Sequence, residues 1–207
     1  MGRAKQGYSC RKAESCDDNV DEKNQDDIRA AQDGDQEAYR RLLEEHQAEI
    51  SRLMWRFCQN TQVCEELVQE VFVEVYCSLG SYKFKAPFIF WLKRIATRVG
   101  YRFWKQRDRQ RRFLRLDETP DMVAPPQEQE ADKINIQQLA YQLLERLPSS
   151  DRLVLTLLYF DQCSTEQIAD RMGWSRAMVK MRAYRARAKL RTIVENEHLL
   201  EDLEWTP

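Results

Sequence analysis

The hydrophobic positions of this chain recur at the spacing of amphipathic helices from Asp26 to about Leu190. No alternating strand pattern and no internal repeat interrupts them. The periodicity predicts a short helix ending near Gly34, followed by helices over residues 35–58, 62–79, 88–112, 136–147, 150–160, 164–172 and 175–191. Residues 1–24 are polar and lack this periodicity, which is typical of a disordered arm.

The stretch STEQIADRMGWSRAMVKMRAYRARAKLR (164–191) predicts two helices joined by a tight turn. Ser164 and Gln167 have the spacing of a capping box at the start of the first helix. Gly173 can adopt the left-handed conformation after that helix, and Ser175 is a second N-cap. A short helix, a tight turn and a basic second helix form the helix-turn-helix layout, whose second helix fits the major groove of DNA.

The second helix of this motif has two distinct faces. Its core face is apolar and consists of Val179, Ala183, Ala186 and Leu190. Its opposite face consists of Ala177, Lys180, Met181, Tyr184 and Ala188, with Arg185 beside it. Residues 171–191 contain eight Lys or Arg and no acid, which favours contact with a polyanion. The alternative is a solvated basic helix pair that packs on another part of the chain.

Charge is segregated along the chain, although the formal net charge of the 207 residues is only −1. Residues 91–112 hold nine basic residues and one acid, and the helix-turn-helix is the second basic block. Residues 117–132 hold six acids and three prolines, which is typical of an extended linker. The prediction is all-α, with two small helical domains joined by a flexible acidic linker. Its divisions are the arm 1–24, the domain 25–112, the linker 113–135, the domain 136–195 and the acidic tail 196–207.

Aromatic and basic residues interleave after residue 80. Cations neutralise phosphates and aromatic faces stack on unpaired bases, so this mixture suits single-stranded or opened DNA. Trp91, Ile95 and Val99 recur at steps of four and are expected in the core. Tyr82 and Phe84, in the predicted loop, are therefore the better candidates for contact.

The predicted helix 62–79 has an acidic face made of Glu65, Glu66, Gln69, Glu70 and Glu74. Such a face is usually only solvated, but it is also suited to docking on a basic partner helix.

The sequence argues against several other classes of protein. Six cysteines without a C-x-x-C pair, and no secretory signal, favour a reduced cytoplasmic protein. No apolar run has the length of a membrane span, so no membrane insertion is expected. We find no nucleophile–base pair, phosphate-binding glycine loop or carboxylate pair, and expect neither catalysis nor a cofactor. Cys10 and Cys16 could bind metal with His46, His198 or Cys58, but no spacing fixes that geometry.

Two stretches of the chain resemble one family, the bacterial RNA polymerase sigma factors of the extracytoplasmic-function type, which are related to sigma-70. The first comprises DQEAYRRLLEEH (35–46), EELVQEVFVEVY (65–76) and FIFWLKRIA (88–96). The second runs over residues 143–190 and includes the helix-turn-helix. The resemblance implies sigma region two followed by sigma region four, and function as the promoter-recognition subunit of the polymerase.

The family's functional positions map onto three sets of residues. Those matching contacts to the clamp helices of the largest core polymerase subunit are Glu66, Leu67, Gln69, Glu70 and Phe72. Those matching recognition and melting of the −10 element of promoter DNA are Tyr82, Phe84, Arg94, Arg98, Arg102 and Lys105. Those matching the −35 contacts are Ser175, Arg176, Lys180, Met181, Tyr184 and Arg185. The resemblance also implies an anti-sigma protein as a partner.

The chain departs from the family at three of these positions. Arg98 and Arg102 stand where the family often has Asn and Asp, and Met181 replaces a usual small polar residue. Two alternative functions remain at this point. One is a free-standing helix-turn-helix regulator that binds an operator without joining polymerase, and the other is a cysteine-based metal- or redox-responsive regulator.

Overall fold

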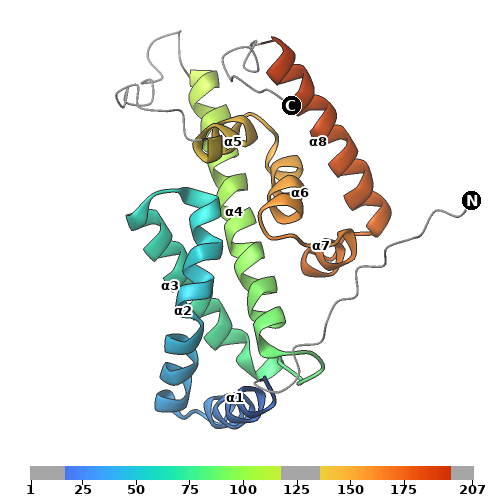
Figure 1. The fold of residues 1–207 in the computed structure, drawn as a ribbon. Coiled ribbons are helices and arrows are strands. Elements are labelled where there is room, and N and C mark those ends of the chain that lie inside the picture. Colours follow the sequence, from blue (N-terminus) through green and yellow to red (C-terminus); the bar gives the residue numbers. More distant parts are fainter. Residues whose placement is uncertain (1–16, 118–135, 197–207) are drawn as a thin grey trace, which may run out of the picture.

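The computed structural model describes residues 17–117 and 136–196 (Figure 1). All the regular elements in these two stretches are helical, so the predicted all-α class is confirmed. They are α1 Asp17–Gln32, α2 Gln36–Cys58, α3 Thr61–Ser78, the 3₁₀ turn η1 Leu79–Ser81, α4 Phe88–Asp117, α5 Ile136–Glu145, α6 Ser149–Tyr159, α7 Thr165–Met172 and α8 Arg176–Asn196. The remaining residues include most of the predicted arm, linker and tail.

Two helices are longer than the periodicity predicted. Helix α1 begins at Asp17, although hydrophobic spacing placed a polar arm up to residue 24. Helix α4 continues to Asp117 instead of ending near Arg112. The α1 extension is DDNVDEKN and the α4 extension is FLRLD, and neither contains Gly or Pro, the residues least compatible with a helix interior. Apolar periodicity therefore located both helices and missed one end of each.

Side chains cap the helices where the sequence indicated. Asp35 Oδ1 accepts hydrogen bonds from the amides of Glu37 at 2.9 Å and Ala38 at 3.2 Å. The capping box is complete, because Gln167 N donates to Ser164 Oγ at 3.2 Å and Ser164 N to Gln167 Oε1 at 2.8 Å. Gly173 has φ +69°, the left-handed conformation that ends α7. These local interactions fix the turn that aims α8.

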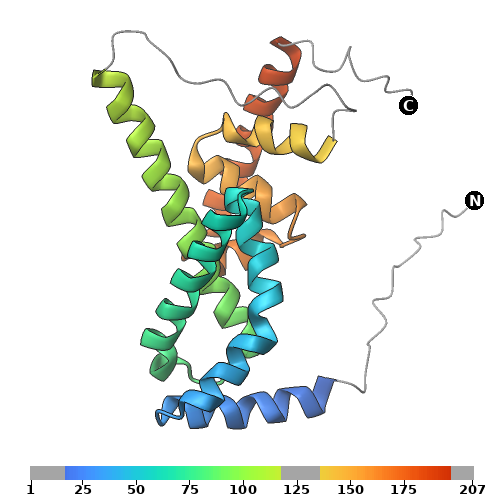
Figure 2. The same ribbon diagram turned by 90° about the vertical axis from the view of Figure 1, so that its left-hand side faces the viewer.

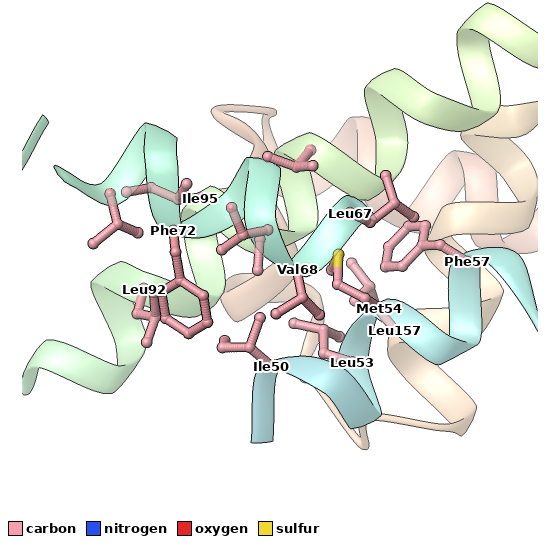
Figure 3. Packing of buried hydrophobic residues seen from close by; sticks show 14 of the residues in the cluster. Ile50, Leu53, Met54, Phe57, Leu67, Val68, Phe72, Leu92, Ile95 and Leu157 are labelled. Carbon is pink, nitrogen blue, oxygen red and sulfur yellow. The ribbon is translucent and has the colours of Figure 1, made fainter. Parts of the chain in front are cut away.

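The core of the N-terminal unit lies between α2, α3 and α4, with α1 across the end of α2 (Figures 1 and 2). Figure 3 shows Ile50, Met54 and Phe57 of α2 meeting side chains from the two neighbouring helices. Gly100 lets α4 come close to α2, because a Cβ at this position would lie 2.5 Å from the ring of Phe57. Trp104 Nε1 donates to the carbonyl of Phe57 at 2.7 Å, which fixes the next turn of α4 against the same residue.

The C-terminal unit is built around α6, which is buried over seven consecutive residues from Asp151 to Leu157. Helix α6 has this environment because it packs against α4, α5, α7 and α8. Its buried carboxylate Asp151 accepts from Lys189 Nζ at 2.7 Å, and Arg182 lies 3.8 Å from its other oxygen. The charge is thus compensated by α8, which ties that helix to the core of the unit.

The two units lie side by side, with α4 packed against α6 and α7 (Figure 1). One hydrophobic cluster runs through both units, and Leu157 of α6 is part of it, close to Phe57 in Figure 3. The two predicted helical units are therefore present. They are joined by a common hydrophobic core as well as by the segment of chain between them.

Candidate nucleic-acid interface

The exposed face of α8 carries the predicted −35 residues. Tyr184 is 71% exposed and Met181 47%, while Val179, Ala183 and Ala186 on the opposite face are buried. Lys180 and Arg185 are also exposed. At the start of the helix, Ser175 Oγ accepts from the amide of Met178 at 3.2 Å, and Arg176 pairs with Glu166 at 2.8 Å. All six residues thus lie on the accessible side or the first turn of α8.

Trp174 sets the position of α8 relative to α4. Its ring meets Tyr101 of α4 edge to face, with 5.8 Å between the ring centroids. The guanidinium of Arg182 lies 4.9 Å from the indole centroid. Cation–π and aromatic contacts of this kind favour one fixed placement of the helix start.

Two of the three arginines predicted for the −10 element, Arg98 and Arg102, are engaged within the protein. Arg98 Nε donates to the carbonyl of Arg171 in α7 at 3.2 Å, and burial lowers the pKa of Arg98. Arg102 bridges Glu70 at 2.6 Å and Glu74 at 2.7 Å, and these hydrogen bonds raise its pKa. Each guanidinium group uses only one of its nitrogens in these bonds, so its other N–H groups remain to donate to a phosphate.

The other two basic residues of this set differ in their surroundings. Arg94 is half-buried, and its Nε has no hydrogen-bond partner among the described residues. Lys105 is exposed, and its Nζ lies 5.6 Å from the ring centroid of Tyr101. Lys105 is therefore an exposed cation of the predicted −10 set that no ion pair engages within the described residues.

Tyr82, which the sequence predicts as a contact residue in the loop, is buried in this conformation. Its side chain is only 7% exposed, and its hydroxyl donates to the carbonyl of Ala86 at 2.6 Å. Its ring packs against Phe88 and Trp91, with centroid distances of 5.4 Å in both cases. An aromatic ring this large is stabilised by burial, which the loop around it provides.

Phe84, by contrast, stays half-buried at the edge of this aromatic cluster. It has φ +54°, which is uncommon for a residue with a side chain and marks a fixed loop conformation. Arg29 lies over its ring at 5.4 Å from the centroid. A cavity of about 270 Å³ opens beside it, lined by Gln25, Ile28, Tyr82, Phe84, Lys85, Ala86, Pro87 and Phe88. The loop thus forms a cavity with an aromatic wall.

The predicted polymerase-binding residues on α3 divide into two groups. Glu66, Gln69 and Glu70 are exposed, whereas Leu67 is 4% and Phe72 7% exposed. The two apolar residues therefore lie in the core and cannot contact a partner directly in this conformation. Their burial follows from the apolar stripe of α3, which faces α2 and α4.

Exposed apolar residues that the sequence reasoning missed lie next to the acidic face of α3. Val73 is 64% exposed and Tyr76 52%, and they border a groove of about 500 Å³ between α2 and α3. Tyr39 lies in the same groove, where its hydroxyl donates to the carbonyl of Phe72 at 2.5 Å and burial raises its pKa. Val73 lies outside the apolar stripe of α3, and this position in the sequence indicates an exposed apolar side chain.

The described residues show no other centre of chemistry. No three side chains of His, Cys, Asp and Glu converge there to hold a metal ion, and Cys10, Cys16 and His198 lie outside those residues. His46 is buried, and its ring packs beside Phe88 at 5.5 Å between centroids. None of the described helices is long and apolar enough to cross a membrane.

Comparison with protein families identifies both units. The model of sigma-70 region 2 matches residues 42–110, and the model of sigma-70 region 4 matches residues 137–190. The chain belongs to the sigma-70 family. It is a sigma factor of the extracytoplasmic-function type, a non-catalytic subunit that directs RNA polymerase to promoters. It binds the core polymerase and DNA.

Relatives of this sigma factor match it along most of their length. The RNA polymerase sigma-H factor of Pseudomonas aeruginosa is 29% identical over 177 residues, which are 80% of this chain and 91% of that protein. The sigma factor SigW of Bacillus subtilis is 25% identical, with 79% of this chain and 92% of SigW covered. The sigma-E factor of Escherichia coli is 26% identical, with 77% and 88% covered.

Two solved structures share the fold of the sigma factor. CnrH, in complex with the cytosolic domain of CnrY, has a TM-score of 0.55 and 24% identity, with 84% of this chain and 98% of that chain covered. RpoE from Bartonella quintana, in complex with the anti-sigma factor NepR, has a TM-score of 0.53 and 18% identity, with 76% and 96% covered.

The contact between regions two and four of the sigma factor is specific. Trp104 of region two is 2% exposed, and the guanidinium of Arg152 in region four lies 3.9 Å from its ring centroid. Burial lowers the pKa of Arg152 to about 10. Asp108 Oδ2 accepts from the amide of Ser149 at 3.3 Å, and Arg56 pairs with Asp161. Sequence reasoning missed these residues, because their pairing joins parts of the chain that are far apart.

Proposed function

We propose that this sigma factor binds promoters at two places and binds polymerase through a third surface. Region four reads the −35 element with Ser175, Arg176, Lys180, Met181, Tyr184 and Arg185. The observation that carries this assignment is the exposed, acid-free face of α8, opposite Val179 and Ala183 in the core. A helix of this kind fits the major groove, where base edges supply discrimination and phosphates supply affinity.

Region two opens the −10 element. Phe84 and the cavity of about 270 Å³ beside it offer an aromatic wall for an extruded base. Arg94, Arg98, Arg102 and Lys105 bind the neighbouring phosphates. Tyr82 supports the loop from beneath, because its buried ring and its hydrogen bond to Ala86 hold the turn in place.

The acidic face of α3 docks on the clamp helices of the largest polymerase subunit through Glu66, Gln69 and Glu70. Val73 and Tyr76 add apolar area beside these residues. Leu67 and Phe72 act from the core by fixing the position of the helix. Because Glu70 also holds Arg102, docking of a basic partner on Glu70 competes with this intramolecular pair and favours release of Arg102 toward DNA.

The proposal places the protein in the cytoplasm and divides it as the sequence suggested, with region two within 25–112 and region four within 136–195. An anti-sigma protein is a further proposed partner. RpoE of Bartonella quintana is bound by an anti-sigma factor in its solved structure, although that likeness shows the fold alone.

Reconstituted transcription tests these assignments. Purified full-length chain and core polymerase are combined with a promoter library, and transcript start sites are mapped. We expect starts that share two upstream elements, with permanganate-reactive thymines at the proximal element. Transcripts that require another sigma factor would support the free-standing regulator instead. Loss of all activity after the purified chain alone is treated with a chelator or a thiol-blocking reagent, which is removed before core polymerase and Mg²⁺ are added, would support the metal- or redox-responsive alternative.

A further inference from the structure

A cavity of about 330 Å³ lies between regions two and four, on the side of the molecule where α2 faces the turn after α6. Its wall contains four basic residues and two acids: Arg52, Arg56, Lys93, Arg171, Glu49 and Asp161. Region two supplies Arg52, Arg56, Lys93 and Glu49, and region four supplies Asp161 and Arg171. The cavity therefore exists only while the two regions are in contact.

The charges in this cavity do not balance. Lys93 pairs with Glu49, and Arg56 pairs with Asp161. No ion pair or side-chain hydrogen bond engages Arg52 or Arg171 within the described part of the chain. Two positive charges, one from each region, thus remain uncompensated in a shared recess.

This excess charge opposes the contact between the two regions. Burial lowers the pKa of Arg56, and the positive charges of Arg171 and Arg52 lower it further. Arg52 is exposed and Arg171 half-buried, and like charges close together at a protein surface repel one another more strongly than they do in bulk water. A doubly negative ligand would remove this repulsion and would bind more tightly than to either region alone.

The chemistry of the wall indicates the class of ligand. Guanidinium groups donate in a planar fork that matches the oxygens of phosphate groups. A water molecule occupies about 30 Å³ of liquid, so the cavity has room for a phosphate group with several waters, or for a chain of phosphates. We propose that this cavity binds a small phosphate-bearing dianion between Arg52 and Arg171, and that the bound anion holds regions two and four together.

The proposal has a quantitative consequence for promoter binding. This consequence rests on the proposed function, in which we infer that regions two and four separate to reach two promoter elements at once. A ligand that binds only the closed arrangement shifts that equilibrium by a factor of 1 + [L]/Kd. At a ligand concentration ten times its Kd, the ratio of closed to open molecules rises about 11-fold. Phosphate-bearing metabolites would then inhibit promoter binding by the sigma factor, because they favour its closed arrangement.

Isothermal titration calorimetry on the full chain tests this, with sodium phosphate, pyrophosphate and ATP as separate probes at constant ionic strength. Citrate is the carboxylate control. We expect binding of at least one phosphate probe to one site, weakened at least tenfold by Arg52→Gln and by Arg171→Gln. Arg40→Gln is the matched control, because Arg40 lies on α2 outside the cavity and its substitution removes the same charge. Circular dichroism verifies that each variant is folded.

Small-angle scattering supplies the second readout. The bound probe should decrease the radius of gyration of the parent chain and leave that of Arg171→Gln unchanged. The three phosphate arms distinguish an inorganic anion from a nucleotide as the source of the phosphate. Absence of binding by all three probes at millimolar concentration overturns the proposal, as does equal binding by Arg52→Gln and Arg40→Gln. Contact of these arginines with DNA phosphates would instead appear as weaker promoter binding without any binding of the small anions.

Discussion

The guanidinium of Arg152 in region four lies 3.9 Å from the ring centroid of Trp104 in region two. Trp104 also donates a hydrogen bond to the carbonyl of Phe57. The same indole ring therefore contacts both the core of region two and Arg152, a buried cation of region four. A cation desolvated over an indole face is stabilised by about 2 kcal/mol or more. Trp104 is thus one residue through which the stability of region two depends on region four.

Trp104→Ala should destabilise the protein by about 3–5 kcal/mol, because it removes a buried ring, a cation–π contact and a hydrogen bond. Urea denaturation followed by circular dichroism measures the change. Phe113→Ala is the matched control on the same helix, since Phe113 is 67% exposed and should change the free energy of unfolding by less than about 0.5 kcal/mol. Equal effects of the two substitutions would contradict the proposed role of Trp104.

Gly100→Ala should cost about 1–3 kcal/mol, because the added Cβ would lie 2.5 Å from the ring of Phe57 and the helices must move apart. Gly80→Ala provides the comparison, since a Cβ there meets nothing within 4 Å. Thermal denaturation of the two variants should show a lower melting temperature only for Gly100→Ala. A loss of similar size at Gly80 would show that helix packing is not the cause.

The stability of the protein should decrease on acidification partly through His46. Burial lowers the pKa of His46 from 6.5, although the nearby carboxylates of Glu45 and Glu49 oppose the shift. The unfolded chain therefore binds a proton near pH 6.5 that the folded chain binds only at lower pH. The free energy of unfolding then falls as the pH falls below about 6.5, by at most about 1.4 kcal/mol per pH unit for one group.

The variant His46→Gln lacks this titrating group, so comparing its free energy of unfolding with that of the parent measures the contribution of His46. The difference in the free energy of unfolding between parent and variant should change between pH 7.5 and pH 5.5, and it should be constant above pH 7.5. Carboxylates titrate equally in both proteins, so the difference isolates the histidine. A difference that does not vary with pH would show that the folded protein protonates His46 as readily as the unfolded chain.

The helix-turn-helix could be predicted in detail because its signals are local. Ser164, Gln167 and Gly173 lie within ten residues of one another, and each acts on the backbone beside it. The side-chain partners of Arg102 could not be predicted, because Glu70 is 32 residues away and periodicity does not show which helix faces which. The burial of Tyr82 could not be predicted for a related reason: a loop aromatic is exposed or buried according to the helices that surround it.

Val73→Ser should weaken binding of core polymerase about tenfold and leave stability nearly unchanged. Val73 is 64% exposed beside the acidic face of α3, so its substitution removes little apolar area from the folded protein. Covering such a side chain in an interface contributes about 1.5 kcal/mol, which is about tenfold in affinity. Phe113 on α4 is exposed to a similar extent, at 67%, but lies outside the proposed polymerase-binding surface. The control Phe113→Ser should therefore leave polymerase affinity unchanged. Fluorescence-detected titration with core polymerase measures both.

Met181→Ser should change the preference of the sigma factor at the −35 element and leave polymerase binding intact. Met181 is 47% exposed on the proposed reading face of α8, opposite the buried Val179 and Ala183. A thioether makes apolar contacts, such as those with the methyl group of thymine, whereas a serine hydroxyl donates to or accepts from base edges. Exchanging one for the other should alter discrimination at one base pair by about 1–3 kcal/mol.

A promoter library with randomised −35 positions, transcribed in parallel by the parent and Met181→Ser, measures this change. The expected result is a changed preference at one or two adjacent positions, with equal affinity of the two proteins for core polymerase. Phosphate contacts, which Lys180 and Arg185 supply in the proposed interface, act on all sequences alike. A uniform decrease across the library would therefore place Met181 away from the bases, and the reading face of α8 would have to be moved around the helix.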